Sequence, residues 1–381
     1  MKKNSQNLRV AFLYDDSLDK NDGVPQFVKR IGTWLSDQGI GVCYLVGQTK
    51  LESWAGGRVY SLAKNITVPF NGNRVATPMP ASLSNIKRVL DAEKFDVLHV
   101  QVPYSPFMAQ RVINRVPTDV GVVGTFHILP TNFLAEFGTR LLRFVYGKSL
   151  RRFDELLAVS PAAAVFAQKS LGIEAVVLPN VVDIGRMRVK YPVNQPNHIV
   201  FLGRLVKRKG CAELLRAFAI LKKRLPEARL TIAGGGPEKS KLEDFVRKNG
   251  LSSSVAFTGF IDEKDKPQLL ASGAIACFPS LGGESFGIVL IEAMAAGAGV
   301  VMGGNNPGYA SVLGENLQTL VDPGNSHKFA EQIEKFLTDQ SLATRLHEQQ
   351  QELVKQYDVN EVGKQLLQVY AQAIASRRQK T

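Results

Sequence analysis

The stretch HIVFLGRLVKRKGCAELLRAFAILKKRL, residues 198–225, contains the pattern that repeats through this chain. Its first part is a short run of β-branched and aromatic residues that ends at Gly203, as is typical of a buried parallel strand. A basic loop follows, and from Cys211 the apolar residues recur at helical spacing. A strand that leads through a short loop into a helix predicts one βα unit of a parallel sheet.

The same alternation occurs in two sets along the 381 residues. The first set of apolar runs is RVAFLY, IGVCYLVG, FDVLHVQV, VGVVGTFH and ELLAVS, and the second is HIVFLGRL, ARLTIAGGG, SVAFTGF and AIACFPS. Residues 179–197, with three prolines and little periodicity, are typical of a linker between them. We therefore predict an α/β protein of two doubly wound Rossmann-like domains, residues 1–180 and 181–361, facing across a cleft. An amphipathic C-terminal helix, about residues 362–381, is expected to pack back on the first domain.

Composition narrows the class of protein. A hydrophobic content of 45% is typical of a globular chain. The first apolar run is too short for a secretory signal, and no run of about 18 apolar residues occurs, so we expect a cytoplasmic protein. Three scattered cysteines predict buried thiols and no metal site. The net charge of +13 suits nucleic acid, an anionic membrane or a phosphorylated ligand, and the lack of nucleic-acid-binding motifs argues against the first.

The stretch GGESFGIVLIEAMAAGAGV, residues 282–300, places Glu284 and Glu292 in an apolar run. We predict a helix over 286–296 with Ser285 as its N-cap, and the N-terminus of such a helix binds phosphate well. Eight residues of helix rise about 12 Å, so the two acids can accept hydrogen bonds from hydroxyls on either side of a diphosphate. In the alternative interpretation, Glu292 pairs with a buried cation and Glu284 is solvated.

A second candidate feature is the basic loop after Gly203. Arg204 and Lys209 are five residues apart at the carboxyl end of a strand, where they can hold a diphosphate. Lys207 and Arg208 are rivals for this role, and a merely solvated basic loop is the alternative. AGGGP, residues 233–237, is another glycine-rich strand end in the same half.

Together, GRLVKRKG, AGGGP, TGF and GESFGIVLIEAMAAG resemble the retaining glycosyltransferases of family 4, which have the GT-B fold. FDVLH, GTFH and PFNGN resemble in particular the phosphatidylinositol mannosyltransferases of that family. The resemblance implies that Arg204 and Lys209 hold the donor diphosphate, Glu284 the transferred sugar and Glu292 the ribose. It extends the donor site to Gly23, Gly235, Phe260, Phe286, Gly287 and Ile288.

The N-terminal half supplies the expected acceptor side. His127 matches the histidine that the family places beside the sugar, and Gly23 allows close approach of the backbone to the donor. The other residues that the resemblance places at the acceptor are Tyr14, Asn71, Gly72 and Arg74. Pro25 stands where the mannosyltransferases have Gln, and Ala76 where they have Arg. These departures weaken the case for a phosphoinositol acceptor. The resemblance at the donor site is not affected by them.

The segment FGTRLLRFVYGKSLRRF, residues 137–153, mixes cations with large apolar residues. This pattern is typical of a helix in a membrane interface, and the alternative is a helix that covers the sheet. The cations are Arg140, Arg143, Lys148, Arg151 and Arg152. Together with the net positive charge of the chain, the segment predicts peripheral association with an anionic membrane surface. The expected surface is the inner face of the plasma membrane.

We therefore expect a retaining, metal-independent hexosyltransferase with His127, Arg204, Lys209 and Glu284 as catalytic residues. The expected donor is GDP-mannose, with UDP-glucose second, and no further cofactor is implied. The expected acceptor is a membrane lipid such as a phosphatidylinositol or another glycolipid precursor. Three alternatives remain, namely a transferase with a soluble sugar acceptor, a sugar phosphorylase and a non-catalytic nucleotide-sugar-binding protein.

Overall fold

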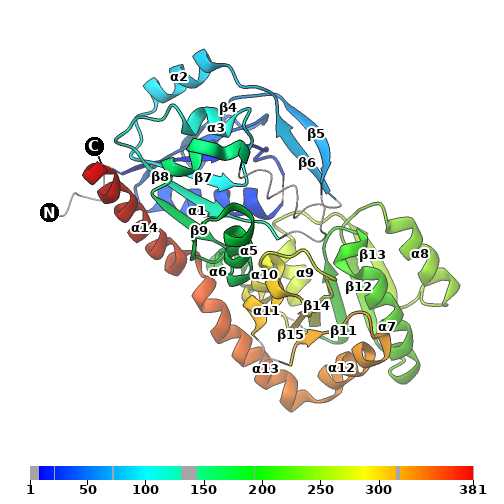
Figure 1. Cartoon of the computed structure of the whole chain (residues 1–381). Coiled ribbons are helices and arrows are strands. Elements are labelled where there is room, and N and C mark those ends of the chain that lie inside the picture. The colour runs from blue at the N-terminus through cyan, green and yellow to red at the C-terminus, as the bar shows by residue number, and fades with distance from the viewer. Residues whose placement is uncertain are drawn as a thin grey trace. The chain divides into compact units, whose positions relative to one another are not determined.

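The computed structural model describes residues 8–380 except 21, 71–72, 130–143, 193 and 315–317, and gives only the backbone of 67–70 and 73–76. The chain forms two compact units (Figure 1). The first comprises Met1–Val181 and Val359–Thr381, and the second comprises Val182–Asp358. The C-terminal segment thus returns to the unit that contains the N-terminal half.

The first unit contains an eight-stranded sheet in the order β10-β9-β8-β7-β1-β2-β4-β3. Neighbouring strands are parallel except for the short pair β3 and β4. The strands, including the separate antiparallel hairpin of β5 and β6, are β1 (Arg9–Tyr14), β2 (Gly41–Val46), β3 (Ser53–Trp54), β4 (Gly57–Ser61), β5 (Asn65–Phe70), β6 (Asn73–Pro78), β7 (Val97–Val102), β8 (Gly121–Phe126), β9 (Glu155–Ala158) and β10 (Val176–Val177). The helices are α1 (Gly23–Asp37), α2 (Leu83–Ala92), α3 (Ala109–Ile113), the 3₁₀ helix η2 (Gly147–Arg152), α5 (Pro161–Leu171) and α14 (Val359–Lys380).

Helix α14 is part of the core of the first unit (Figure 1). Val362, Leu366, Tyr370 and Ala373 are fully buried, and their spacing of three or four residues places them on one face of the helix. This face packs against β7, β8 and β9 and against α1. The Tyr370 hydroxyl also lies 2.8 Å from Nδ1 of the buried His99 on β7.

A buried ionic contact fixes the end of α14. The Asp154 side chain, just before β9, is fully buried and accepts a hydrogen bond from the Val122 amide at 2.9 Å. Arg377 donates to the same carboxylate, with Nη2 2.8 Å from Oδ1, and also to the Arg152 carbonyl. Because the acid has no access to water, it depends on these partners for its charge.

The second unit contains a six-stranded, all-parallel sheet in the order β13-β12-β11-β14-β15-β16. Counted along the unit, this is the 3-2-1-4-5-6 order of a doubly wound Rossmann fold, which binds ligands where the order reverses, here between β11 and β14. The strands are β11 (Gln195–Leu202), β12 (Arg229–Ala233), β13 (Val255–Gly259), β14 (Gly273–Phe278), β15 (Val300–Gly304) and β16 (Leu320–Val321). The helices are α6 (Ile184–Met187), the 3₁₀ helix η3 (Lys207–Lys209), α7 (Cys211–Arg224), α8 (Lys239–Lys248), α9 (Lys266–Ala271), α10 (Ile288–Ala296), α11 (Pro307–Leu313), α12 (Ser326–Thr338), α13 (Gln340–Leu353) and the 3₁₀ helix η4 (Val354–Tyr357).

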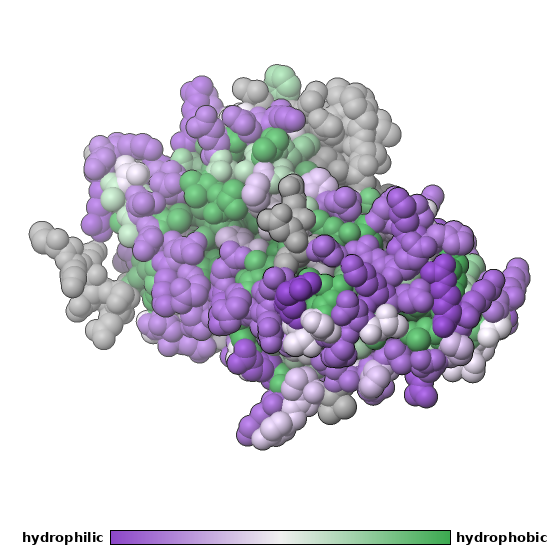
Figure 2. Space-filling view, turned by 90° about the horizontal axis from the view of Figure 1, so that it is seen from below, coloured by the Kyte–Doolittle hydropathy of each residue, from purple (hydrophilic) through white to green (hydrophobic). Residues whose placement is uncertain are grey.

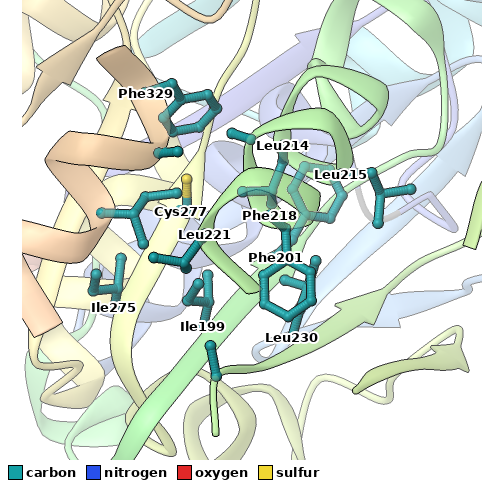
Figure 3. Packing of buried hydrophobic residues seen from close by; sticks show 14 of the residues in the cluster. Ile199, Phe201, Leu214, Leu215, Phe218, Leu221, Leu230, Ile275, Cys277 and Phe329 are labelled. Atoms are coloured by element: carbon teal, nitrogen blue, oxygen red, sulfur yellow. The ribbon is translucent and has the colours of Figure 1, made fainter. Parts of the chain in front are cut away.

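The core of the second unit lies between its sheet and helices α7 and α12 (Figure 3). Leu214, Phe218 and Leu221 of α7 are fully buried, as their helical spacing predicts. Two of the cysteines, Cys211 and Cys277, also lie in this core, and burial raises the pKa of both thiols. All three cysteines are buried and free, so the prediction of buried thiols is confirmed. Outside the cores, hydrophilic residues cover most of the face in Figure 2.

Candidate functional site

The loops after β11 and β14 meet at the point where the strand order of the second unit reverses. The Arg208 carbonyl accepts hydrogen bonds from the Leu281 amide at 2.8 Å and from Ser280 Oγ at 3.1 Å. Gly210 has a φ of 74°, and a Cβ there would overlap the Pro279 carbonyl oxygen, so a glycine is needed for this approach. The close contact of the two loops brings the basic segment to the acidic one.

Glu284 is the centre of this contact. It is buried, and its Oε1 lies 2.6 Å from Arg208 Nη1, 2.8 Å from Lys209 Nζ and 2.8 Å from Ser280 Oγ. Burial alone raises the pKa of Glu284, but the charges of Lys209 and Arg208 outweigh it and hold the pKa at about 2. The alternative that Glu284 is solvated is therefore wrong, and the acid is ionised in contact with two cations.

The cations of the basic loop have partners that differ from those predicted. Lys209 pairs with Glu284 as described, and burial lowers its pKa although Glu284 raises it. Arg208, which the sequence left as a rival, is the second partner of Glu284. Arg204 is half-buried and close enough for its charge to lower the pKa of Lys209. Two cations, Arg208 and Lys209, thus contact the acid, and the charge of Arg204 reaches Lys209, an arrangement that suits an anionic ligand beside Glu284.

Helix α10 begins later than predicted. It starts at Ile288 with Gly287 as N-cap, so Phe286 precedes the helix and Ser285 is not its N-cap. Gly287 has a φ of 124°, and a Cβ there would lie 2.7 Å from the Tyr309 ring of α11. The packing of α11 against this turn therefore prevents an earlier start. As Glu284 lies outside the helix, the helical rise of about 12 Å does not describe its distance from Glu292.

Glu292 lies inside α10 and is buried. Its Oε1 accepts a hydrogen bond from Lys266 Nζ at 3.2 Å, and the same ammonium lies 2.8 Å from Glu263. This is the contact with a buried cation that the alternative interpretation predicts for Glu292. The ribose contact stays a prediction.

The remaining predicted donor residues of the second unit fall into two groups. Gly235 and Phe260 lie together, because a Cβ at Gly235 would be 2.7 Å from the Phe260 ring, and that ring is 86% exposed. The Gly235 carbonyl accepts from the Leu205 amide at 2.8 Å, which joins this pair to the basic loop. Phe286, by contrast, is buried and packs edge-on against Tyr357 at 5.4 Å between ring centroids. Its side chain therefore packs in the interior of the unit and anchors the loop that carries Glu284.

In the first unit, His127 lies directly after β8. It is buried, its Nε2 lies 2.7 Å from Gln101 Oε1, and the Phe27 ring packs on it at 5.3 Å. Burial lowers the pKa of His127 to about 3, so the imidazole is neutral at physiological pH. Sequence reasoning missed Gln101, although a polar residue inside an apolar parallel strand was an available signal.

The end of β1 and the start of α1 carry the other predicted residues of this unit. Gly23 is exposed and is the first residue of α1, with Asp22 as N-cap. Burial raises the pKa of Tyr14, and the charges of Asp16 and Asp22 raise it further. Three acids of this segment, Asp15, Asp16 and Asp22, thus lie near enough to Tyr14 for their charges to raise its pKa. Asn71 and Gly72 lie outside the described residues, and of Arg74 only the backbone, in β6, is described.

The expected membrane segment is described only from residue 144 on, so Arg140 and Arg143 lie outside the described residues. The rest is not one amphipathic helix through residue 153, because the 3₁₀ helix η2 occupies Gly147–Arg152 and η2 begins at a glycine with a φ of 46°. Lys148 and Arg151 are exposed, whereas Arg152 donates to the carbonyls of Pro117 and Val120 within the unit. These two exposed cations remain available to a lipid surface.

Comparison with known proteins assigns a family to the two halves of the chain. The model of the family described as Glycosyltransferase Family 4 matches residues 21–186, and that of Glycosyl transferases group 1 matches residues 183–353. The chain therefore belongs to the family 4 glycosyltransferases, as its motifs predicted, and it is a glycosyltransferase with the GT-B fold.

Among particular proteins, the chain is similar to the phosphatidyl-myo-inositol mannosyltransferase of Mycolicibacterium smegmatis, with 30% identity over 95% of this chain and 93% of the relative. The enzyme of the same name from Propionibacterium freudenreichii is 29% identical over 96% of this chain and 95% of its own length.

Solved structures share the fold. Anabaena Alr3699/HepE, crystallised in complex with UDP, has a TM-score of 0.73 and 18% identity, with 96% of this chain and 100% of that chain covered. The sucrose-phosphate synthase of Thermosynechococcus elongatus has a TM-score of 0.74 and 20% identity, with 97% and 100% covered. No helix in the described part of the chain is long and apolar enough to cross a membrane.

Proposed function

We propose that this glycosyltransferase moves a hexose, preferably mannose, from GDP-mannose to a membrane lipid acceptor with retention of configuration. The observation that carries the donor half of the proposal is the buried Glu284 among Arg208, Lys209 and Ser280 at the reversal of the strand order. The relatives described as phosphatidyl-myo-inositol mannosyltransferases support mannose and a lipid acceptor.

The donor would be held by charge and by hydroxyl contacts. Arg204 and Lys209 would bind the diphosphate, and they would stabilise the charge that develops on it when the sugar leaves. Glu284 uses Oε1 for its three protein partners. A hydroxyl of the transferred sugar would then be bound by the other carboxylate oxygen, and Glu292 would accept from the ribose. Phe260, exposed beside Gly235, would cover the base.

The transfer step would need no covalent intermediate. The acceptor hydroxyl attacks the anomeric carbon from the face of the leaving group, the bond between that carbon and the diphosphate oxygen breaks, and a phosphate oxygen takes the hydroxyl proton. Glu284 is ionised, with its pKa at about 2, and His127 is neutral, so neither is suited to give a proton to the leaving group. Their part is to bind and orient the sugar.

A ligand screen followed by a transfer assay tests the donor. We expect GDP-mannose to raise the melting temperature of the protein more than UDP-glucose does, since a ligand that binds only the folded state stabilises it. With GDP-mannose and a lipid extract, NMR of the product should show the α configuration of the donor. Stabilisation by UDP-glucose alone would overturn the choice of donor, and a β product would overturn retention.

An uncharged soluble sugar is a second candidate acceptor, and the acidic surroundings of Tyr14 favour it. Asp15 is buried beside Tyr14, and Asp16 follows it with Lys20 as its ion-pair partner at 2.6 Å. Asp15 already accepts from the Ser105 and Ala109 amides, and burial raises its pKa to about 7. The acids that would accept hydrogen bonds from sugar hydroxyls and repel an anionic headgroup are therefore Asp16 and the exposed Asp22. Transfer to simple soluble glycosides at the rate seen with lipid extracts would favour this acceptor.

Vesicle binding tests the membrane part of the proposal. Phe144 is 81% exposed, and it precedes the exposed cations Lys148 and Arg151 in the same segment. We expect the protein to sediment with phosphatidylglycerol vesicles and not with phosphatidylcholine vesicles. Reversing Lys148 and Arg151 to Glu should weaken binding at least tenfold, because each cation near such a surface contributes about 1 kcal/mol.

The matched control has the same change in net charge on the second unit. Lys241 and Arg247 are exposed cations of α8, so the pair K241E and R247E should bind vesicles more tightly than the K148E and R151E pair does. If both pairs of substitutions weaken vesicle binding equally, the effect comes from net charge and Lys148 and Arg151 have no special role. If the unchanged protein does not sediment with the vesicles, the proposed membrane association is wrong.

A further inference from the structure

A ladder of buried polar side chains runs between β7 and β8 of the first unit. His99 and Gln101 alternate with apolar residues on β7, where they stand opposite Val123 and Thr125 of β8, and His127 comes just after β8. The contacts of the ladder are therefore diagonal, from each β7 residue to the residue two places further along. His99 Nε2 lies 2.7 Å from Thr125 Oγ1, and Gln101 Oε1 lies 2.7 Å from His127 Nε2. The two strands are thus joined by two side-chain contacts on one face of the sheet, in addition to their backbone hydrogen bonds.

The Gln101 amide has a defined orientation in this ladder. It is 2% exposed, and its Nε2 donates to the His99 carbonyl at 3.5 Å, so its Oε1 is the atom that faces His127. An amide oxygen only accepts hydrogen bonds, so the proton of this contact lies on His127 Nε2. As burial keeps the imidazole neutral, Nδ1 carries a lone pair and can only accept.

The imidazole is held in place by its neighbours. Its own backbone amide donates to the Val102 carbonyl at 3.1 Å, and the Phe27 ring of α1 packs edge-on against it. At the other end of the ladder, His99 Nδ1 lies 2.8 Å from the Tyr370 hydroxyl of α14. The ring of His127 is therefore oriented by contacts from β7, α1 and its own backbone. It stands at the carboxyl end of β8, the edge at which doubly wound sheets bind ligands.

We propose that Gln101 is a positioning residue that fixes His127 in the Nε2–H tautomer, so that Nδ1 accepts a hydrogen bond from a hydroxyl of the sugar during transfer. This role rests on the proposed function for its ligand, whereas the tautomer rests on the hydrogen-bond ladder alone. It gives Gln101 a part in selecting ligands with a hydroxyl donor at this point. A ligand with a hydrogen or a methoxy group in place of that hydroxyl would lose the contact.

Nitrogen-15 NMR of protein labelled at its histidines tests the tautomer without reference to activity. The chain has five histidines, and the variant His127→Gln identifies the signals of His127 by their loss. At pH 7 we expect a protonated Nε2 and a bare Nδ1, and in Gln101→Met we expect the two tautomers to mix. A proton on Nδ1 in the unchanged protein would overturn the proposal.

Transfer kinetics test the role. Gln101→Met should lower kcat/KM for sugar transfer about tenfold, the effect of one lost hydrogen bond at its upper range. The affinity for GDP should not change, because the predicted diphosphate ligands belong to the other unit. The matched control Gln168→Met, at an exposed position of α5, should leave both quantities unchanged.

The outcomes separate the two proposals. A mixed tautomer in Gln101→Met with unchanged kcat/KM would refute the positioning role and leave the transferase proposal standing. An Nε2–H imidazole in a protein that transfers no sugar from any nucleotide-sugar would refute the proposed function, and with it the ligand of His127.

Discussion

Replacing Glu284 with Gln is expected to lower the turnover of sugar transfer several hundredfold, the range that follows loss of one electrostatic contact at a transition state. The carboxylate balances Lys209 and Arg208 at 2.8 and 2.6 Å, and a neutral amide cannot. The two half-buried cations would then repel each other and turn away from their present positions. The measurement is kcat with saturating donor and acceptor, together with circular dichroism to establish that the fold is intact.

A control variant and a pH series accompany the Glu284→Gln measurement. Glu238→Gln, which breaks an exposed ion pair with Lys241 on the same unit, should keep the turnover of the unchanged protein. Because the pKa of Glu284 is about 2, the ratio between the Glu284→Gln variant and the unchanged protein should also be constant from pH 6 to pH 8. A folded Glu284→Gln variant with ordinary turnover would exclude this acid from the reaction.

The low pKa of Glu284 also makes the stability of the second unit depend on pH. A carboxyl whose pKa is lower in the folded than in the unfolded chain stabilises the fold at a pH above its unfolded value, here 4.5. That contribution decreases as the pH falls toward the folded value of about 2. The second unit of the unchanged protein should therefore lose more stability below pH 4.5 than the same unit of Glu284→Gln.

Replacing Asp154 with Ala is expected to destabilise the first unit by about 3 kcal/mol, the cost of removing one partner from a buried ion pair. Arg377 would keep its charge without the carboxylate that now lies 2.8 Å away, and the Val122 amide would lose its acceptor. Amides of α14 should then exchange hydrogen roughly a hundredfold faster, because local opening sets the exchange rate. Mass spectrometry of peptides from residues 359–380 measures this rate.

The second unit serves as an internal reference for this experiment, because its peptides should exchange as before. The control variant is Glu361→Ala, which removes an exposed ion pair with Lys364 on the same helix and should change exchange little. Unchanged exchange of α14 in Asp154→Ala would mean that the apolar face of the helix is sufficient to hold it.

The fold could be predicted because its determinants are periodic. Apolar runs such as those that became β11 and β14 are short and alternate with helical segments. The family resemblance assigns the basic loop and Glu284 to one donor site, and the structure shows that both follow strands that flank the reversal of the sheet order.

What the sequence did not reveal depends on contacts between distant segments. Arg208 and Lys209 are adjacent in the chain, and only the approach of the β14 loop shows that both reach Glu284. The start of α10 depends on α11, whose Gly308 packs so closely on Glu284 that a Cβ would overlap its carbonyl oxygen. Likewise, the contact of Gln101 with His127 depends on the register that places Gln101 opposite Thr125, which no local pattern in the sequence reveals.

The return of α14 to the first unit affects the order in which the chain can fold as it leaves the ribosome. The second unit is one continuous segment, Val182–Asp358, and it has its entire core once that segment has emerged. The first unit must wait for Val362, Leu366 and Tyr370, which are made after the whole second unit and fill the interior of the first. During synthesis, the face of this sheet that α1 and α14 share is therefore expected to be covered by α1 alone while the second unit is already folded.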